Sequence, residues 1–281
     1  MSKKYSSKAI KRQALRLVKS ALNSVRRQQG PKTVVLIVGC QRSGTTMLVN
    51  VFDNDLGTRV YDENSELTCN RAGGLRLKSL ETVGSALAKR KERLIVIKPI
   101  VESQNVRWLL DNLENSKAIW VYRHYRAVVV SNLQKFGIEN GLADLRPIAE
   151  NRSDDWRSEK VSTKLRRTVS GLYSADMDPY DAAALFWFAR NSLFFELDLM
   201  HDDRILLCKY EDFVREPEIE TRKIYSFLGV GLPDANITGG VHSGSVGRGR
   251  NVRLADEVGS LCRDLYERME AAYQTSRENR P

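Results

Sequence analysis

A strand, a glycine-containing turn and a helix follow one another near the start of the chain, and this succession limits the fold most strongly. The run TVVLIV, residues 33–38, is continuous and rich in β-branched side chains, as in a strand buried on both faces of a parallel sheet. The turn GCQRSGTT, residues 39–46, joins it to a helical pattern that extends to residue 54. Such a turn presents backbone amides at a helix N-terminus, which attracts anions. The sequence therefore predicts an α/β fold with an anion site in this turn.

Three more apolar runs have the character of buried strands. They are RLIVIK at 93–98, KAIWVY at 117–122 and RILLCK at 204–209. Helical patterns separate or follow them, at 103–114, 125–136, 179–200 and 217–228. Strands that alternate with helices predict a single domain over residues 32–281, with a central parallel β-sheet flanked by helices. The polar span 137–178 has weak periodicity and is too long for a simple connection, so we interpret it as an insertion near the substrate.

The turn differs from the phosphate loop of nucleotide triphosphatases at one position. Gly39 and Gly44 have the usual spacing, but Thr45 replaces the lysine, and the nearest cation is Arg42. The predicted strands also lack the acidic residue that holds Mg²⁺ in such enzymes. We therefore expect no metal, and a single phosphate that carries another small anion, with Ser43, Thr45 and Thr46 as hydroxyl donors. The alternative for this turn is a degenerate phosphate loop of a nucleotide or small-molecule kinase.

A second basic motif, YRHYRAVVVSN, follows the third apolar run. Arg123 ends the strand, and Ser131 lies eight residues later, almost two turns into the predicted helix. A bend at the strand end would let the two side chains hold one phosphate together. The alternative is a surface arginine and an ordinary helical serine.

The segments GCQRSGTTML, IVIKP, WVYRHYRAVVVS and KYEDFVREPEIETRKIYSFLGV resemble, in this order, motifs of the sulfotransferases that use 3′-phosphoadenosine 5′-phosphosulfate (PAPS). The resemblance covers residues 33–252 and implies the fold of the P-loop-containing nucleotide hydrolases, with PAPS as co-substrate. It implies that the turn holds the 5′-phosphosulfate and a second group the 3′-phosphate. The turn residues are Arg42, Ser43, Gly44, Thr45 and Thr46, and the second group is Arg123 and Ser131.

The segment GSVGRGRN, residues 244–251, is similar in composition and position to the family's segment that closes over the 3′-phosphate. On this resemblance Arg248, Gly249 and Arg250 join the donor site, although a flexible basic loop would have the same composition. Arg42, where cytosolic members usually carry lysine, resembles the Golgi-type, tyrosylprotein and bacterial carbohydrate branches. We therefore expect a carbohydrate or glycolipid acceptor, with protein tyrosine or a small phenol as alternatives.

The segment VYDENSEL offers a base for the acceptor hydroxyl. Glu63 lies 21 residues after Arg42, which is similar to the spacing of the catalytic glutamate in tyrosylprotein sulfotransferases. We expect Glu63 to be the base, with Asp62 and Glu66 as weaker candidates. Cytosolic members use a histidine of a KTH motif, but this chain reads IKPI there and keeps only Lys98. The resemblance implies that Lys98 and Arg42 stabilise the transferring group.

Two other histidines have weaker claims. His124 adjoins Arg123, and we expect it to serve local structure rather than act as a base. His242 precedes the glycine-rich segment and could approach it.

The net charge of +10 belongs to the N-terminal arm, residues 1–31, and the lysine that follows it. Residues 1–32 contain ten Lys/Arg and no acid, so the remaining 35 Lys/Arg equal the 35 Asp/Glu of the chain. Apolar residues at helical spacing predict a basic amphipathic helix that docks on its own domain or contacts an anionic membrane through residues 1–30. We expect no nucleic-acid partner, because the body is neutral; a non-catalytic membrane-surface or nucleic-acid-binding module is the second alternative. Without an apolar run of about 20 residues or a signal-peptide core, we expect a cytoplasmic location, with the inner membrane surface as an alternative site.

Overall fold

The computed structural model describes residues 31–278 together with Lys19, so nearly all of the predicted basic helix lies outside the described residues. A five-stranded sheet forms the centre, with the order β2-β5-β1-β6-β7 and parallel pairing throughout. Its strands are β1 (Thr33–Gly39), β2 (Thr58–Tyr61), β5 (Leu94–Ile97), β6 (Ser116–Tyr122) and β7 (Ile205–Lys209). The four predicted strands are therefore confirmed, and β2 is an additional edge strand.

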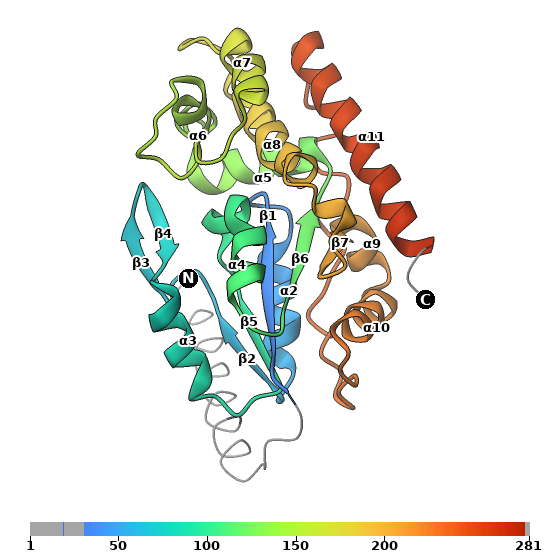
Figure 1. Ribbon diagram of the computed structural model, residues 1–281. Coiled ribbons are helices and arrows are strands. Elements are labelled where there is room, and N and C mark those ends of the chain that lie inside the picture. Colours follow the sequence, from blue (N-terminus) through green and yellow to red (C-terminus); the bar gives the residue numbers. More distant parts are fainter. Residues whose placement is uncertain (1–18, 20–30, 279–281) are drawn as a thin grey trace, which may run out of the picture.

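Helices cover both faces and the upper edge of this sheet (Figure 1). They are α2 (Thr45–Asn54), α3 (Leu80–Ala88), α4 (Val106–Asn112), α5 (Tyr125–Phe136), α6 (Asn140–Ala149), α7 (Thr163–Leu172), α8 (Pro179–Glu196), α9 (Tyr210–Arg215), α10 (Pro217–Leu228) and α11 (Asp256–Glu278). Two 3₁₀ turns, η1 (Ile100–Asn105) and η2 (Leu199–His201), and an antiparallel hairpin of β3 (Thr68–Arg71) and β4 (Gly74–Leu77) complete the fold. The helices predicted at 45–54, 125–136 and 217–228 have these bounds in the structure. None of the helices in the described part of the chain is long and apolar enough to cross a membrane.

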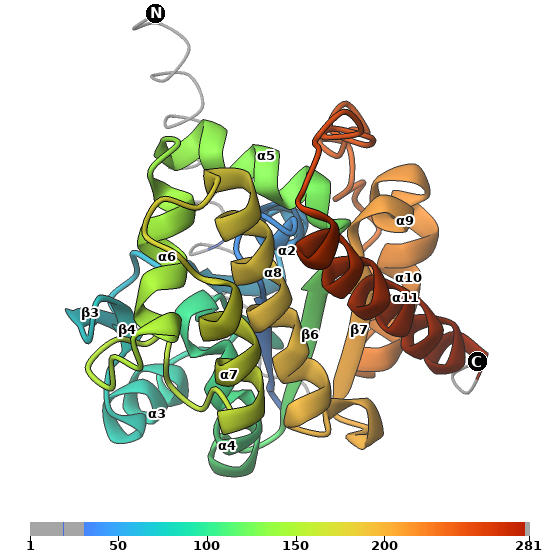
Figure 2. The ribbon, with the colours of Figure 1, turned by 90° about the horizontal axis from the view of Figure 1, so that it is seen from above.

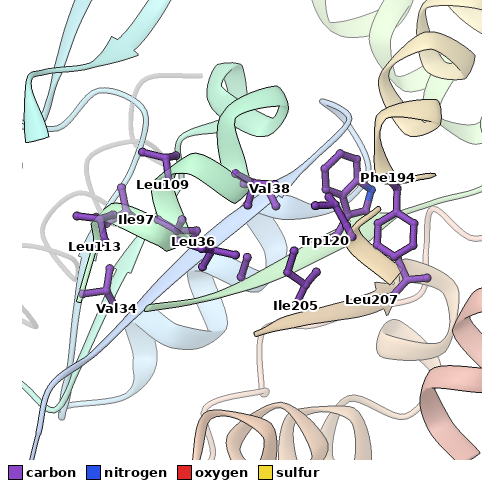
Figure 3. Close-up of a cluster of buried hydrophobic side chains, with 14 of the residues drawn as sticks. Val34, Leu36, Val38, Ile97, Leu109, Leu113, Trp120, Phe194, Ile205 and Leu207 are labelled. Atoms are coloured by element: carbon purple, nitrogen blue, oxygen red, sulfur yellow. The ribbon is translucent and has the colours of Figure 1, made fainter. Parts of the chain in front are cut away.

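The central strand is buried on both faces, as its continuous apolar run predicts. Val34, Leu36 and Val38 face a cluster with α4 and the ends of α8 and α11, in which Trp120 lies against Phe194 at 5.7 Å between ring centroids (Figure 3). The alternate residues of β1 face α2 and α10 on the other side of the sheet. Seen from above, α3 and α4 lie on one side of the strands and α2 on the other (Figure 2). The result is a three-layer α/β domain.

Much of the span 137–178 is regular, although its sequence shows weak periodicity. Helices α6 and α7 lie here, and their buried residues Leu145, Ile148, Leu165 and Val169 share a core cluster with α5 and α8. Pro147 lies inside α6, where local propensity disfavours a helix, so packing rather than local propensity holds α6.

The carboxyl end of β1 is the switch point of the sheet, because the strands that follow β1 in sequence lie first on one side of it and then on the other. From β1 the connections run to β2 and β5 on one side and later to β6 and β7 on the other. Ligands of open α/β sheets bind at this kind of switch point. The turn 39–46 lies there, and α5 to α8 lie above the same edge (Figure 1).

Candidate active site

Two glycines shape the turn between β1 and α2. Gly39 has φ +124°, and a Cβ there would lie 2.3 Å from the carbonyl oxygen of Val121. Gly44 has φ +105°, and its Cβ would lie 2.3 Å from the ring of Tyr210. Both positions therefore require glycine, because the backbone conformation and the close neighbours each exclude a side chain.

The start of α2 is open to an anion. Gly44 provides no side-chain cap, and no acidic residue lies in the first turn of α2. The Ser43 side chain is fully buried, and its Oγ has no hydrogen-bond partner within the described residues. A buried hydroxyl rarely stays unsatisfied, so Ser43 and the free amides of α2 fit an anion at this place.

Arg42 extends from the same turn in a left-handed backbone conformation with φ +67°. Its Nε donates to Ser131 Oγ at 3.1 Å, and the guanidinium lies 6.0 Å from the centre of the Phe136 ring. Partial burial lowers the pKa of Arg42 from its ordinary value. Ser131 thus contacts the turn itself, through the residue that the sequence assigns to the 5′-phosphosulfate.

Lys98 joins the turn to the predicted base. Its side chain is 4% exposed, and Nζ donates to Thr46 Oγ1 at 2.7 Å and to Glu63 Oε1 at 3.0 Å. The other two acids turn away. Asp62 is exposed and accepts from the amide of Asn64, and Glu66 pairs with Arg90 at 3.0 Å. The structure therefore brings Glu63, Lys98 and the turn together and leaves Asp62 and Glu66 outside.

Arg123 directly follows β6, the strand next to β1, and is buried. Its guanidinium stacks on Tyr210 at 4.3 Å, and Nη2 donates to the carbonyl oxygen of Ser245 at 2.6 Å. Its Nε has no partner among the described residues. Burial lowers the pKa of Arg123. Tyr210 and the Glu211 carboxylate act to raise it, whereas the positive charges of Arg248 and Arg42 act to lower it. The three arginines therefore share one electropositive region.

The glycine-rich segment 244–251 lies against the start of α5. Gly249 has φ +80°, and a Cβ there would lie 2.3 Å from the carbonyl oxygen of Arg126. The hydroxyl groups of Ser245 and Tyr210 are 2.5 Å apart, which ties the segment to the residue under Arg123. Arg248 and Arg250 are exposed. In the part of the chain that the structure describes, no ion pair involves Arg42, Arg123, Arg126, Arg248 or Arg250.

Two of the three histidines, His124 and His242, are those that the sequence sets near this site. His124 Nδ1 accepts from the amide of Arg126 at the start of α5, its ring stacks on Tyr125, and burial lowers its pKa to about 4. His242 is exposed.

Sequence reasoning missed two contributors to the site. Tyr210, in the KYED motif, closes the turn at Gly44 and supports Arg123, and its position directly after a buried strand was the available signal. Asp144 accepts from Gln41 in the turn at 2.7 Å and from Asn140 and Arg157. No motif marks Asp144, because its partner in the turn, Gln41, lies 103 residues away in sequence.

The fold and this edge define a phosphate-loop-type α/β protein, with an anion site at the switch point and several unpaired arginines around it. The profile of the sulfotransferase domain family matches residues 32–246, and the chain belongs to this family. It is a sulfotransferase with a single α/β domain, as the sequence predicts. A search of curated protein sequences gave no match.

Several solved structures are similar to this chain. The sulfotransferase domain from the Synechococcus PCC 7002 olefin synthase has 18% identity and a TM-score of 0.48 over 85% of this chain and 98% of that one. The sulfotransferase domain from the curacin biosynthetic pathway has 17% identity and a TM-score of 0.47, over 85% of this chain and 99% of that one. Mouse sulfotransferase SULT7A1, complexed with PAP, has 15% identity and a TM-score of 0.47, over 92% of this chain and 91% of that one.

Proposed function

We propose that this sulfotransferase transfers the sulfuryl group of PAPS to a hydroxyl group of a carbohydrate or glycolipid, with Glu63 as the base. The observation that carries the proposal is the contact of Lys98 with both Glu63 and Thr46. It places a carboxylate and an ammonium group at the mouth of the anion-binding turn. An acceptor that approaches the turn would meet both groups.

The donor fits the arrangement of unsatisfied groups. The turn, with the free Ser43 hydroxyl and Arg42, suits the 5′-phosphosulfate. Arg123, with its unpaired Nε, and Arg248 suit the 3′-phosphate. Guanidinium groups bind phosphate through several parallel hydrogen bonds, and none of these arginines is occupied by a carboxylate of the described residues. Ser131 lies beside Arg42 and is positioned to orient it.

Sulfuryl transfer resembles phosphoryl transfer, in which positioning and charge stabilisation dominate catalysis. The acceptor hydroxyl gives its proton to the Glu63 carboxylate while its oxygen forms a bond to sulfur. The bond between sulfur and the 5′-phosphate oxygen breaks, and that oxygen keeps the electron pair. Lys98 and Arg42 stabilise the charge that develops on the sulfuryl group and the departing phosphate.

Replacement of the proposed base tests this function. The Glu63→Gln protein should bind 3′-phosphoadenosine 5′-phosphate (PAP) as the unchanged protein does, because the ionic partner of Glu63 among the described residues is Lys98 rather than an arginine of the proposed donor site. Its sulfation of a saccharide panel with radiolabelled PAPS should fall by about 10²–10⁴-fold, which is the usual contribution of a general base. The matched control is Asp62→Asn, since Asp62 is adjacent but exposed. Full activity of Glu63→Gln would remove Glu63 from the mechanism, and loss of activity in Asp62→Asn would show that the loop rather than the carboxylate matters.

A further inference from the structure

A second hollow lies apart from the anion site, between β4, the start of α3, α4 and the segment that precedes α7. Its volume of about 350 Å³ is within the range of small-ligand sites. Glu102 and Asn105 of η1 form part of its lining, and η1 begins two residues after Lys98. The pocket and the catalytic lysine are therefore connected by a single short segment.

The inner wall of the pocket is a fixed network of ion pairs. Arg76 forms a fork with Glu102, with Nε–Oε1 at 2.6 Å and Nη2–Oε2 at 2.8 Å, and its Nη2 also donates to Glu159 at 2.8 Å. Asn105 donates to both carboxylates. Burial acts to raise the pKa of Glu159, but hydrogen bonds from Gln104, Asn105 and Arg76 outweigh it and lower the pKa. The carboxylates of Glu102 and Glu159 thus already accept hydrogen bonds from partners within the protein.

The outer lining carries three cations that lack such partners. Arg71, Lys78 and Lys160 form no ion pair among the described residues, and the Arg71 guanidinium donates to the carbonyl oxygen of Leu77. Because Arg76 offsets part of the charge of Glu102 and Glu159, these three leave the pocket with an excess of positive charge. An anionic ligand is favoured on electrostatic grounds.

An aromatic surface lies next to these cations. The Trp108 side chain is 49% exposed, whereas the other three tryptophans of the chain are buried. An indole ring offers a flat apolar face with a polar edge, and a pyranose ring has one apolar face with polar groups around its rim. Trp108 beside Lys78 and Lys160 therefore matches a sugar that carries an acidic substituent.

We propose that this pocket binds an acidic sugar residue, carrying a carboxylate or a sulfate ester, of an oligosaccharide acceptor whose hydroxyl group reacts at Glu63. The proposal rests on the carbohydrate acceptor of the proposed function and specifies its charge. Glu102 and Asn105 follow Lys98 by four and seven residues, and η1 begins at Ile100. With about 3.5 Å per residue before η1 and about 2 Å per residue within it, the chain places them at most roughly 11–17 Å from Lys98. One oligosaccharide can reach both.

Tryptophan fluorescence tests the pocket directly, because Trp108 is the tryptophan that solvent reaches. A hyaluronan tetrasaccharide, which carries carboxylates, and a chondroitin 4-sulfate tetrasaccharide should change the emission of the full chain, and neutral maltotetraose should not. The response should disappear in Trp108→Phe and weaken in high salt. An equal response to maltotetraose, or a full response in Trp108→Phe, would overturn the proposal.

Charge variants separate this proposal from the proposed function. Lys78→Gln with Lys160→Gln should weaken binding of the acidic tetrasaccharides about tenfold, as calorimetry measures it, and leave PAP affinity unchanged. Lys164→Gln, at an exposed lysine of α7 outside the pocket, is the matched control and should bind like the unchanged protein. Unchanged saccharide binding in the double variant contradicts the pocket. Retained PAP binding without any saccharide binding overturns the pocket alone, whereas saccharide binding without PAP binding overturns the proposed function alone.

Discussion

Gly44 is the residue on which the geometry of the anion site depends most. Its φ of +105° is a conformation that L side chains rarely adopt, and the ring of Tyr210 fills the space where a Cβ would project. Tyr210 in turn supports Arg123, so the two proposed phosphate sites share this contact. A Cβ added at Gly44 would therefore disturb both proposed phosphate sites through Tyr210.

Gly44→Ala should lower the free energy of unfolding by about 1–3 kcal/mol, because alanine is strained at this φ. It should also weaken PAP binding, since the Tyr210 ring must move away from the turn. Thermal unfolding with and without PAP measures both effects. The control is Gly84→Ala in the middle of α3, where nothing lies within 4 Å of the added Cβ, and it should raise stability by about 0.5–1 kcal/mol. Equal behaviour of the two variants would contradict the strain at Gly44.

The sequence predicts the separate residues of the site better than their contacts. Glu63 and Lys98 could each be proposed from motifs, but they are 35 residues apart in the chain. They meet because β2 pairs with β5 in a register that sets Tyr61 beside Ile97, so the residues that follow the two strands lie together. The strand β2 has only four residues at the sheet edge, and its short sequence TRVY gave no continuous apolar signal.

At the scale of elements, the buried strands and most helices could be predicted because their patterns are local. The strand β1 and helix α5 follow from an apolar run and a helical period, and α8 follows from Asp178-Pro179, where Asp178 Oδ1 caps the amide of Tyr180 at 2.7 Å. Helix α6 could not be predicted, because its position depends on the hydrogen bonds of Asp144 to distant residues. The bond from Gln41 links the 137–178 span to the anion-binding turn.

Asp144→Ala tests that link between elements. The carboxylate is buried and pairs with Arg157 at 2.8 Å, so its removal should lower the free energy of unfolding by about 3 kcal/mol. PAP affinity should also fall, because Gln41 loses its partner in the turn. Asp154→Ala, which removes an exposed ion pair with Arg152, should change stability by less than about 1 kcal/mol. Chemical denaturation measures both losses of unfolding free energy. Similar losses in the two variants would contradict the link through Asp144.

Helix α5 gives the fold a pH dependence through its capping residue. The folded protein holds the pKa of His124 at about 4, below its ordinary value of 6.5, because burial disfavours the charged ring. Between these values the unfolded chain binds a proton that the folded chain does not, so stability falls as the pH is lowered from about 6.5 to 4. Allowing for the part of the ring that solvent screens, the loss is of the order of 1–2 kcal/mol. His124→Asn keeps a capping acceptor and should reduce this slope in denaturation curves, and an unchanged slope would assign the effect to other groups.

At the scale of the whole molecule, the site lies where three independent features coincide. The switch point of the sheet, the N-terminus of α2 and a group of arginines that form no ion pair with a carboxylate of the described residues meet at one edge. Beyond the basic N-terminus the chain has equal numbers of basic and acidic residues, so the positive region is a local feature. Of the basic N-terminal arm, Lys19 is described, and its Nζ donates to Asp53 at 3.3 Å and to the carbonyl oxygen of Thr58 at 3.1 Å.

The central claim is that this edge binds a nucleotide with a 3′-phosphate rather than a metal-bound triphosphate. Calorimetric titration of the full chain compares PAP in EDTA with ATP in Mg²⁺, and the matched variant is Arg123→Gln. We predict that PAP binds at least about tenfold more tightly than ATP, and that Arg123→Gln removes most of this preference, because it deletes the proposed charged hydrogen bond to the 3′-phosphate. Equal affinities for PAP and ATP, or a preference that survives Arg123→Gln, would contradict the account and favour the kinase alternative.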